Sequence, residues 1–308
     1  MVKKTLIFAM VLLSFASIAQ TNLNEKSFSF KSKNGHEVLP QKGDWSIGLS
    51  ASGLLQYAGN FLNGATATNT APLFVNANGP AILNSQHNLG GAAFFGKYML
   101  SSNKAIRVRF LLNNFSETKS GYVLENSLIT NPLSPNFVID KYTKNIANCV
   151  LGIGLEKRRG NNRLQGIYGA ELFLGFLSEA STYSYGNDIN INFTSPNSSN
   201  FGNNLNGLSG VNFSRSLEER LGRTFYMGTR GYIGAEYFFA PKISLGVEVG
   251  YSLAMATNSD ASRIDETFNA SELKTVEVET KLKRNNGFST FGISLDNANA
   301  GLNLFLYF

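Results

Sequence analysis

The sequence predicts an all-β protein: a single transmembrane antiparallel up-and-down β-barrel of eight strands, with short periplasmic turns and long extracellular loops. Three observations predict this fold class. Apolar and polar residues alternate with a period of two in eight segments, as in strands with one apolar face. The connections between these segments are alternately short and long, as in transmembrane barrels. The last segment, residues 297–308, has a continuous apolar face and ends on the aromatic Phe308.

A cleavable signal peptide is predicted for residues 1–19. Lys3 and Lys4 form its basic region, residues 6–13 its apolar core, and residues 17–19 a small-residue cleavage pattern. The apolar run is too short to span a hydrocarbon core of roughly 30 Å, which argues against a membrane anchor helix. Residues 20–43 then form a periplasmic N-terminal leader, mostly irregular, and residues 44–308 form the barrel.

The first strand shows the alternation clearly, because Trp45, Ile47 and Leu49 are separated by small or polar residues. In a barrel such an apolar face meets lipid, whereas in a soluble β-sandwich, the structural alternative, it would meet a second sheet. The predicted strands cover residues 45–57, 92–100, 106–112, 147–155, 168–176, 225–239, 243–253 and 297–308.

The connections set the orientation of the predicted barrel. The short ones are residues 101–103, 157–162 and 240–241, and the long ones are 59–87, 116–144, 178–222 and 258–296. Loops this long are uncommon in compact soluble domains, which disfavours the sandwich. Both ends of the barrel should then be periplasmic, with an aromatic girdle of Trp45, Tyr98, Phe239 and Phe308 at that interface.

One stretch departs from the simple pattern. Residues 273–282 alternate, and Phe291 and Ile293 are out of phase with the final strand. A β-bulge near Asp296 and Asn297 would restore the phase. We therefore expect residues 272–295 to form a hairpin that rises above the membrane and leads into the last strand. A barrel of ten strands is the alternative.

Charged residues fall on the polar faces of the predicted strands. In a barrel of eight strands these faces meet in a narrow lumen, where unpaired charge is costly. Four basic and four acidic side chains should therefore form a closed, salt-bridged interior, and a gated ion path is the functional alternative. The predicted lumen charge network consists of Lys97, Arg107, Arg109, Glu156, Glu171, Arg230, Glu236 and Glu248.

Few residues suggest catalysis or cofactor binding. The chain has two histidines, His36 in the leader and His87 near a strand end, and one cysteine, Cys149. No His or Cys cluster has metal-ligand spacing, so we predict no metal, no cofactor and no enzymatic activity. The net charge of +6 does not suggest a nucleic-acid partner.

The longest predicted loop, residues 178–222, is rich in Asn, Ser and aromatic residues. Such residues suit adaptable contacts with a protein or glycan, although exposed loops commonly have this composition as well. Apolar rings exposed on a loop favour a partner-contacting surface. The candidate partner-binding residues are Tyr183, Tyr185, Phe193, Phe201 and Phe213.

Several short stretches resemble a known family. They are residues 43–45 (GDW), 156–160 (EKRRG), 163–166 (RLQG), 234–238 (GAEYF), 240–244 (APKIS) and 303–308 (NLFLYF). Residues 43–308 thereby look like small outer-membrane β-barrel proteins of the OmpA/OmpX-like superfamily, in the form common in Bacteroidetes. The resemblance implies the cell outer membrane as location, outer-membrane lipid as surroundings and the barrel-assembly machinery as a partner during biogenesis.

The resemblance is specific for fold and place rather than for role. Our first hypothesis for the role is a structural or surface-interaction component of the cell envelope. Two alternatives stay open, namely a small porin-like channel and a membrane-embedded enzyme that modifies lipid or peptide.

Overall fold

The computed structural model describes residues 30–50, 92–127, 135–160, 162–199, 201, 213–283 and 290–308. These residues form ten antiparallel strands: β1 Trp45–Ser50, β2 Ala92–Ser101, β3 Lys104–Leu124, β4 Phe137–Arg159, β5 Leu164–Ser184, β6 Ser214–Ala240, β7 Ile243–Asn258, β8 Ala261–Asn269, β9 Lys274–Leu282 and β10 Thr290–Tyr307. No helix long and apolar enough to cross a membrane occurs in the described ranges. The predicted signal peptide, the predicted first strand beyond Ser50 and the predicted loop 59–87 lie outside them.

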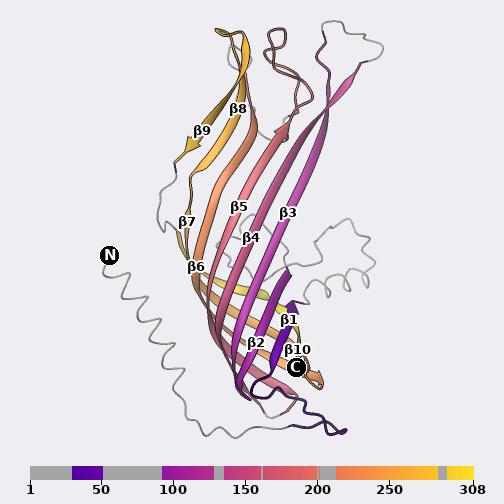
Figure 1. Ribbon diagram of the computed structural model, residues 1–308, viewed down its shortest axis with the longest axis vertical. Coiled ribbons are helices and arrows are strands. Elements are labelled where there is room, and N and C mark those ends of the chain that lie inside the picture. Colours follow the sequence, from indigo (N-terminus) through magenta and orange to yellow (C-terminus); the bar gives the residue numbers. More distant parts are fainter. Residues whose placement is uncertain are drawn as a thin grey trace, which may run out of the picture.

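Eight of the strands close into a ring, which confirms the predicted fold class and its strand number. The ring runs β1-β2-β3-β4-β5-β6-β7-β10, and β1 pairs with β10 to close it (Figure 1). At the closure, the backbone groups of Trp45 and Phe308 exchange two hydrogen bonds of 2.9 Å. A closed ring leaves no strand edge unpaired, as a hydrocarbon environment requires.

The alternation of residues divides the wall into two faces. On β1, the side chains of Trp45, Ile47 and Leu49 point outward and are between 46 and 56% exposed, whereas Ser46 is 2% exposed. Similar apolar residues cover the outside of the other ring strands, including Ile153 and Ile233. This arrangement of an apolar outer surface around a buried polar interior is that of a membrane-spanning barrel.

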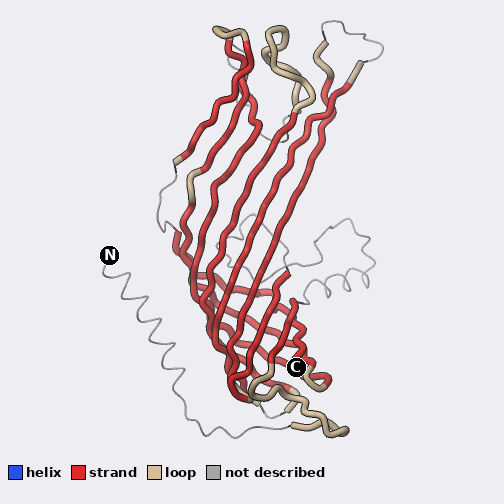
Figure 2. The backbone as a smooth tube through the Cα atoms, viewed as in Figure 1, coloured by secondary structure: helices blue, strands red, loops and turns tan. Residues whose placement is uncertain are grey.

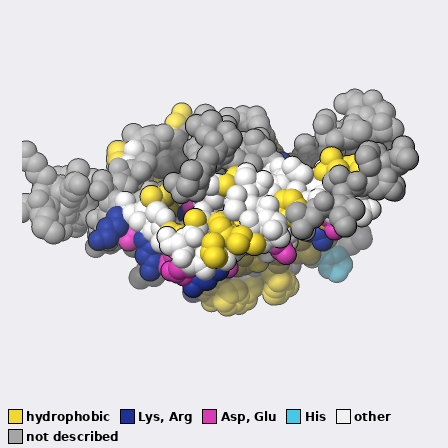
Figure 3. All heavy atoms as spheres, turned by 90° about the horizontal axis from the view of Figure 1, so that it is seen from above, with side chains coloured by type: hydrophobic (Ala, Val, Ile, Leu, Met, Phe, Trp, Pro, Cys, Tyr) yellow, Lys and Arg dark blue, Asp and Glu magenta, His cyan; other side chains and the backbone are white. Residues whose placement is uncertain are grey.

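The ring has two unlike ends. The short turns after β2, β4 and β6 lie at one end, which the topology makes periplasmic, and β3 to β6 rise far beyond the ring at the other, extracellular end (Figure 2). Seen from above in Figure 3, basic and acidic side chains lie side by side at the extracellular end.

Most of the described part of the predicted long loops 116–144, 178–222 and 258–296 is strand rather than loop. β3 pairs with β4 without interruption from Lys104 to Leu124, and the Thr118 and Thr143 hydroxyls lie 3.0 Å apart across the two strands. The apolar face ends near Leu112, but backbone pairing does not need an apolar face. The alternation of apolar and polar residues therefore stops near Leu112, whereas the strand itself continues to Leu124.

The hairpin predicted at residues 272–295 was placed incorrectly. β9 pairs with β8, which precedes it, and β8 in turn pairs with the upper part of β6. The tight turn between β8 and β9 ends at Leu273, whose φ of 52° lies in the left-handed region. The predicted bulge in the final strand is confirmed, because the pairing of β10 with β7 shifts register between Asp296 and Gly301.

Residues 30–43 of the leader, which was predicted to be mostly irregular, form a compact plug with one short bridge. Lys31 and Glu37 form an antiparallel bridge around a turn at Gly35, where φ is 79°. Val38 and Leu39, which lie beside the turn after β6 at the periplasmic mouth of the ring, are 0 and 5% exposed and belong to the buried apolar cluster. The described part of the leader, residues 30–43, therefore covers this mouth of the barrel.

A closed ring of paired strands should resist detergent at room temperature, because no edge is available at which unfolding can start. We expect unboiled protein to migrate differently from boiled protein on a denaturing gel, with β-type circular dichroism. Equal migration of the two samples would contradict the closed ring.

Candidate functional site

The most distinctive site of this protein is the interior of the ring. The eight side chains of the predicted charge network all point inward from β2 to β7, and each is between 0 and 2% exposed. They form two layers, one close to the periplasmic mouth and the other in the middle of the ring. We call them the lower and the upper charge layer.

The lower charge layer is centred on two carboxylates. Lys97 Nζ lies 2.9 Å from Glu156 Oε1 and 3.0 Å from Glu236 Oε2, so that one ammonium group joins β4 to β6. The other oxygen of Glu236 accepts hydrogen bonds from the hydroxyls of Ser244 and Tyr307. Every oxygen of this buried carboxylate thus has a donor, which compensates its desolvation.

The upper charge layer is built from three guanidinium groups and two carboxylates. Arg107 binds Glu248 in a two-pronged contact with N–O distances of 2.7 and 3.0 Å. Arg230 Nη2 donates to the same carboxylate at 3.0 Å, and Arg109 Nη2 lies 2.6 Å from Glu171 Oε1. Arg107 also lies 3.7 Å from Glu156, which connects the two layers. Bidentate pairs of this kind fix geometry as well as charge.

Sequence reasoning missed a ninth charged member, Arg158. Its side chain is 1% exposed, and its Nη2 lies 3.1 Å from Glu156 and 3.0 Å from Glu236. Arg158 follows Glu156 by two positions and therefore shares its face, but the predicted turn began at residue 157. Five cations thus meet four carboxylates among the described lumen residues, rather than four of each.

Aromatic rings and glycines complete the charge layers. The Arg107 guanidinium lies 4.5 Å from the ring centre of Tyr232, and Lys97 Nζ lies 3.8 Å from that of Phe305. At Gly250, a Cβ atom would lie 2.9 Å from the Arg230 guanidinium. The glycine on β7 therefore makes room for the large side chain opposite.

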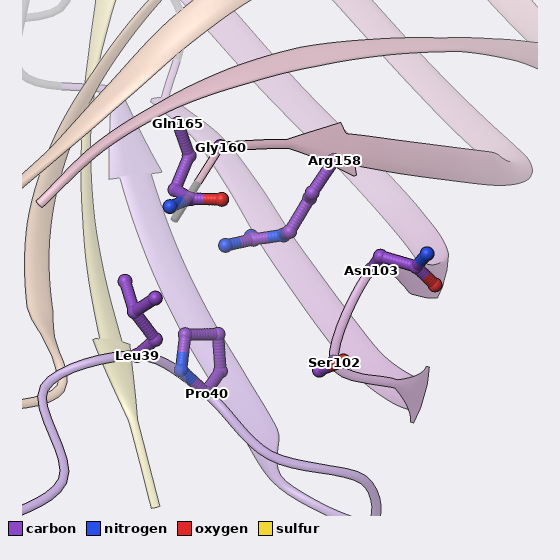
Figure 4. Close-up of a pocket in the computed structure, with 7 residues that line it drawn as sticks. All are labelled: Leu39, Pro40, Ser102, Asn103, Arg158, Gly160 and Gln165. Atoms are coloured by element: carbon purple, nitrogen blue, oxygen red, sulfur yellow. The ribbon is translucent and has the colours of Figure 1, made fainter. Parts of the chain in front are cut away.

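The lumen is filled on both sides of the charge layers. On the extracellular side, Leu111, Val150, Phe173 and Tyr226 are at most 4% exposed and form an apolar layer. On the periplasmic side, the leader forms part of a small pocket into which Arg158 points, toward Leu39 and Gln165 (Figure 4).

Above the ring, residues 185–199, here called the inner strap, cross the inner face of the extended strands. Asp140, 0% exposed, accepts hydrogen bonds from the backbone N–H of Gly186 at 2.9 Å and of Ser199 at 2.6 Å. Arg215 donates to the Asn187 carbonyl at 2.7 Å. These contacts fasten the inner strap to β4 and β6.

Of the five candidate partner-binding rings, one is buried and four are half-buried. Tyr183 is 8% exposed, and its ring stacks on Tyr185 with centroids 6.4 Å apart. Phe201 stacks on Tyr142 at 5.9 Å, while Phe193 and Phe213 are half-buried. Burial raises the pKa of the Tyr185 phenol more than nearby Arg215 lowers it. Tyr183 is therefore not exposed as expected, whereas partner binding by the other four rings, which are half-buried, stays a prediction.

The predicted girdle residues lie together at the periplasmic end. Trp45 and Tyr98 are cross-strand neighbours with ring centroids 4.7 Å apart. Trp45, Phe239 and Phe308 are 48 to 65% exposed on the outer wall.

Groups suited to catalysis are sparse in the described part of the chain. No cluster of His, Cys, Asp and Glu there has the arrangement of a metal site. His36 is exposed on the leader, Cys149 is half-buried, and His87 lies outside the described residues.

The fold and the interior define a class of protein: a membrane-spanning β-barrel of eight strands with a charge-paired lumen. No family model matches the sequence, and no curated protein matches it. Among solved structures, the outer membrane protein OprG from Pseudomonas aeruginosa matches 88% of this chain and 98% of its own, with 9% identity and a TM-score of 0.31. A major outer membrane protein from Thermus thermophilus matches 86% of this chain and 99% of its own, with 9% identity and a TM-score of 0.33.

The pairing around Glu248 predicts the effect of its removal. Glu248→Ala leaves Arg107 and Arg230 without their shared carboxylate, and should destabilise the barrel by roughly 3–5 kcal/mol. Glu272→Ala is the matched control, because it removes an exposed carboxylate that pairs with Lys274 at 2.6 Å and should cost about 0–1 kcal/mol. Urea titration of the folded protein in lipid, followed by Trp45 fluorescence, measures both. Equal midpoints would contradict a stabilising role for the upper charge layer.

Proposed function

We propose that this protein is an integral outer-membrane β-barrel with a closed, salt-bridged lumen, and that it acts as a structural or surface-interaction component of the cell envelope. The observation that carries the proposal is the burial of Val38 and Leu39 of the leader, of both charge layers and of the apolar layer inside the ring. An open pore needs a water-filled path, and buried ion pairs that cross the lumen favour a closed interior instead.

The location in the cell outer membrane rests on physical and sequence arguments. The exposed apolar residues of the ring suit lipid, and the predicted signal peptide suits export. The resemblance to the OmpA/OmpX-like superfamily, in the form common in Bacteroidetes, adds outer-membrane lipid and the barrel-assembly machinery as the expected partners. The proposal assigns the protein no catalytic step and no nucleic-acid partner.

Planar-bilayer recordings test the closed lumen. Wild-type protein should insert without steady conductance, because the charge layers obstruct the path for ions. Deletion of residues 30–43 is the informative second variant: it removes the plug but leaves both charge layers, so we expect it to stay non-conducting.

The gel shift of unboiled protein verifies folding of each inserted sample. Steady, sizeable conductance from the wild type would favour the porin-like channel. If only the deletion variant conducts, the leader rather than the charge layers blocks the passage of ions.

The extended strands offer an outward surface for the interaction role. At the tip of the β3–β4 hairpin, Tyr122 faces Ile139 and Leu124 faces Phe137, and the four side chains are 43 to 73% exposed. We call this group the tip patch. A polar section of the same face, which includes Ser116, separates it from the lipid-facing residues. Isolated apolar groups of this kind mark protein contacts.

A photo-crosslinking residue at position 122 should form a covalent adduct with a neighbouring envelope protein in intact cells. The same residue at Ser116 is the matched control, because it lies on the same strand face within the polar section. Similar crosslinking at both positions, or at neither, would argue against the tip patch as a protein contact.

A further inference from the structure

Arg158 uses only one nitrogen of its guanidinium group in the contacts of the lower charge layer. Its contacts with Glu156, Glu236 and the Tyr307 hydroxyl all go through Nη2. Within the described parts of the chain, neither Nε nor Nη1 of Arg158 has a hydrogen-bond acceptor, although the side chain is 1% exposed. A donor that is buried without an acceptor is costly, so a ligand that supplies an acceptor is favoured at this position.

The small pocket at the periplasmic mouth, here called the Arg158 cavity, lies next to these nitrogens. The guanidinium group of Arg158 extends into it between Gln165 and Leu39 (Figure 4). Its volume is about 20 Å³. A cavity of roughly 10–15 Å³ is enough for one water molecule. The Arg158 cavity therefore has room for one water molecule or one ion of similar size.

Hydrogen bonds fix the walls of the Arg158 cavity. The side-chain amide of Gln165 donates to the Asn162 carbonyl at 2.6 Å, which holds that amide at the cavity. The backbone N–H of Arg158 donates to the Asn103 carbonyl at 2.8 Å and joins β4 to the turn after β2. Ser102, on the same turn, also lines the cavity. The site is therefore formed in advance of any ligand, which lowers the cost of binding.

The surroundings of Arg158 favour an anion over a neutral acceptor. Hydrogen bonds from a guanidinium group to an anion are roughly twice as strong as those between neutral groups. Leu39 of the leader supplies an apolar wall, which strengthens the attraction between opposite charges. The nearest carboxylates are already paired, because Lys97 Nζ lies 2.9 Å from Glu156 and 3.0 Å from Glu236.

We propose that the Arg158 cavity binds one monoatomic, monovalent anion such as chloride, with N–H groups of Arg158 and the Ser102 hydroxyl as its donors. A water molecule could use the same donors, but it would make the stability of the barrel independent of the kind of anion in solution. The inference goes beyond the proposed function, because it assigns a ligand to the interior of the barrel.

The thermal midpoint of the gel shift, measured on the full chain in detergent, tests this site. Sodium chloride is compared with sodium gluconate at equal concentration, because gluconate has the same charge but is too large for the Arg158 cavity. A ligand that binds only the folded state raises the midpoint. Wild-type protein should therefore have the higher midpoint in chloride, and the rise should level off as the chloride concentration increases.

Three variants locate the effect. Arg158→Lys keeps a cation beside Glu156 and Glu236 but removes the donors on Nε and Nη1, so it should lose most of the chloride-dependent rise. Ser102→Leu leaves Arg158 unchanged and fills the cavity, and should lose the rise as well. Arg220→Lys is the matched control, because its side chain is 66% exposed in the extracellular part, and should keep the full rise.

A full rise in either cavity variant would place the anion elsewhere and overturn the inference. Equal midpoints of the wild type in chloride and gluconate would also overturn it, because water would then suffice. If Arg158→Lys does not give the folded band of unboiled protein, Ser102→Leu decides alone. Failure of the proposed function has a different readout, namely steady conductance of the wild type in the bilayer recordings.

Discussion

Charge compensation in the lumen is the constraint on which the barrel depends. A ring of eight strands has an interior only wide enough for side chains, so that every charge placed there loses most of its water. Glu236 illustrates how a buried charge is compensated. Its carboxylate forms ion pairs or hydrogen bonds with Lys97, Arg158, Ser244 and Tyr307, which come from four different strands. Each carboxylate thereby holds the wall together across the lumen as well as compensating the cations.

The same constraint fixes the register of the strands. Arg107, Val108 and Arg109 are consecutive, and the two arginines enter the upper charge layer while the valine faces outward, 38% exposed. A slip of one residue would send both guanidinium groups into lipid and a valine into the lumen, at a prohibitive electrostatic cost. The ion pairs are weak evidence for net stability, but they exclude alternative pairings of β3 with β2 and β4.

Residues that alternate within the ring were predictable from sequence, and residues whose position depends on distant contacts were not. The period of two predicted the inward direction of Lys97 and Glu248, and the phase change predicted the bulge before Gly301. Arg158 was missed because the charged residues from position 157 onward were assigned to a turn, although β4 continues through them. The strand extensions were missed because polar pairs such as Thr118 and Thr143 interrupt the outward apolar face, which breaks the hydrophobic period but not the backbone pairing.

The inner strap explains why Tyr183 and Tyr185, at the start of the longest predicted connection, pack against other rings on the extended sheet. Above the membrane, both faces of the extended sheet would meet water, and a sheet needs an apolar contact on one face for stability. Tyr142, Tyr183 and Tyr185 supply that contact together with the inner strap, and Asp140 satisfies two of its backbone donors. Aromatic composition alone does not distinguish a binding loop from a core element. Because the strap occupies the concave face, the convex face with its tip patch is the surface that remains for partners.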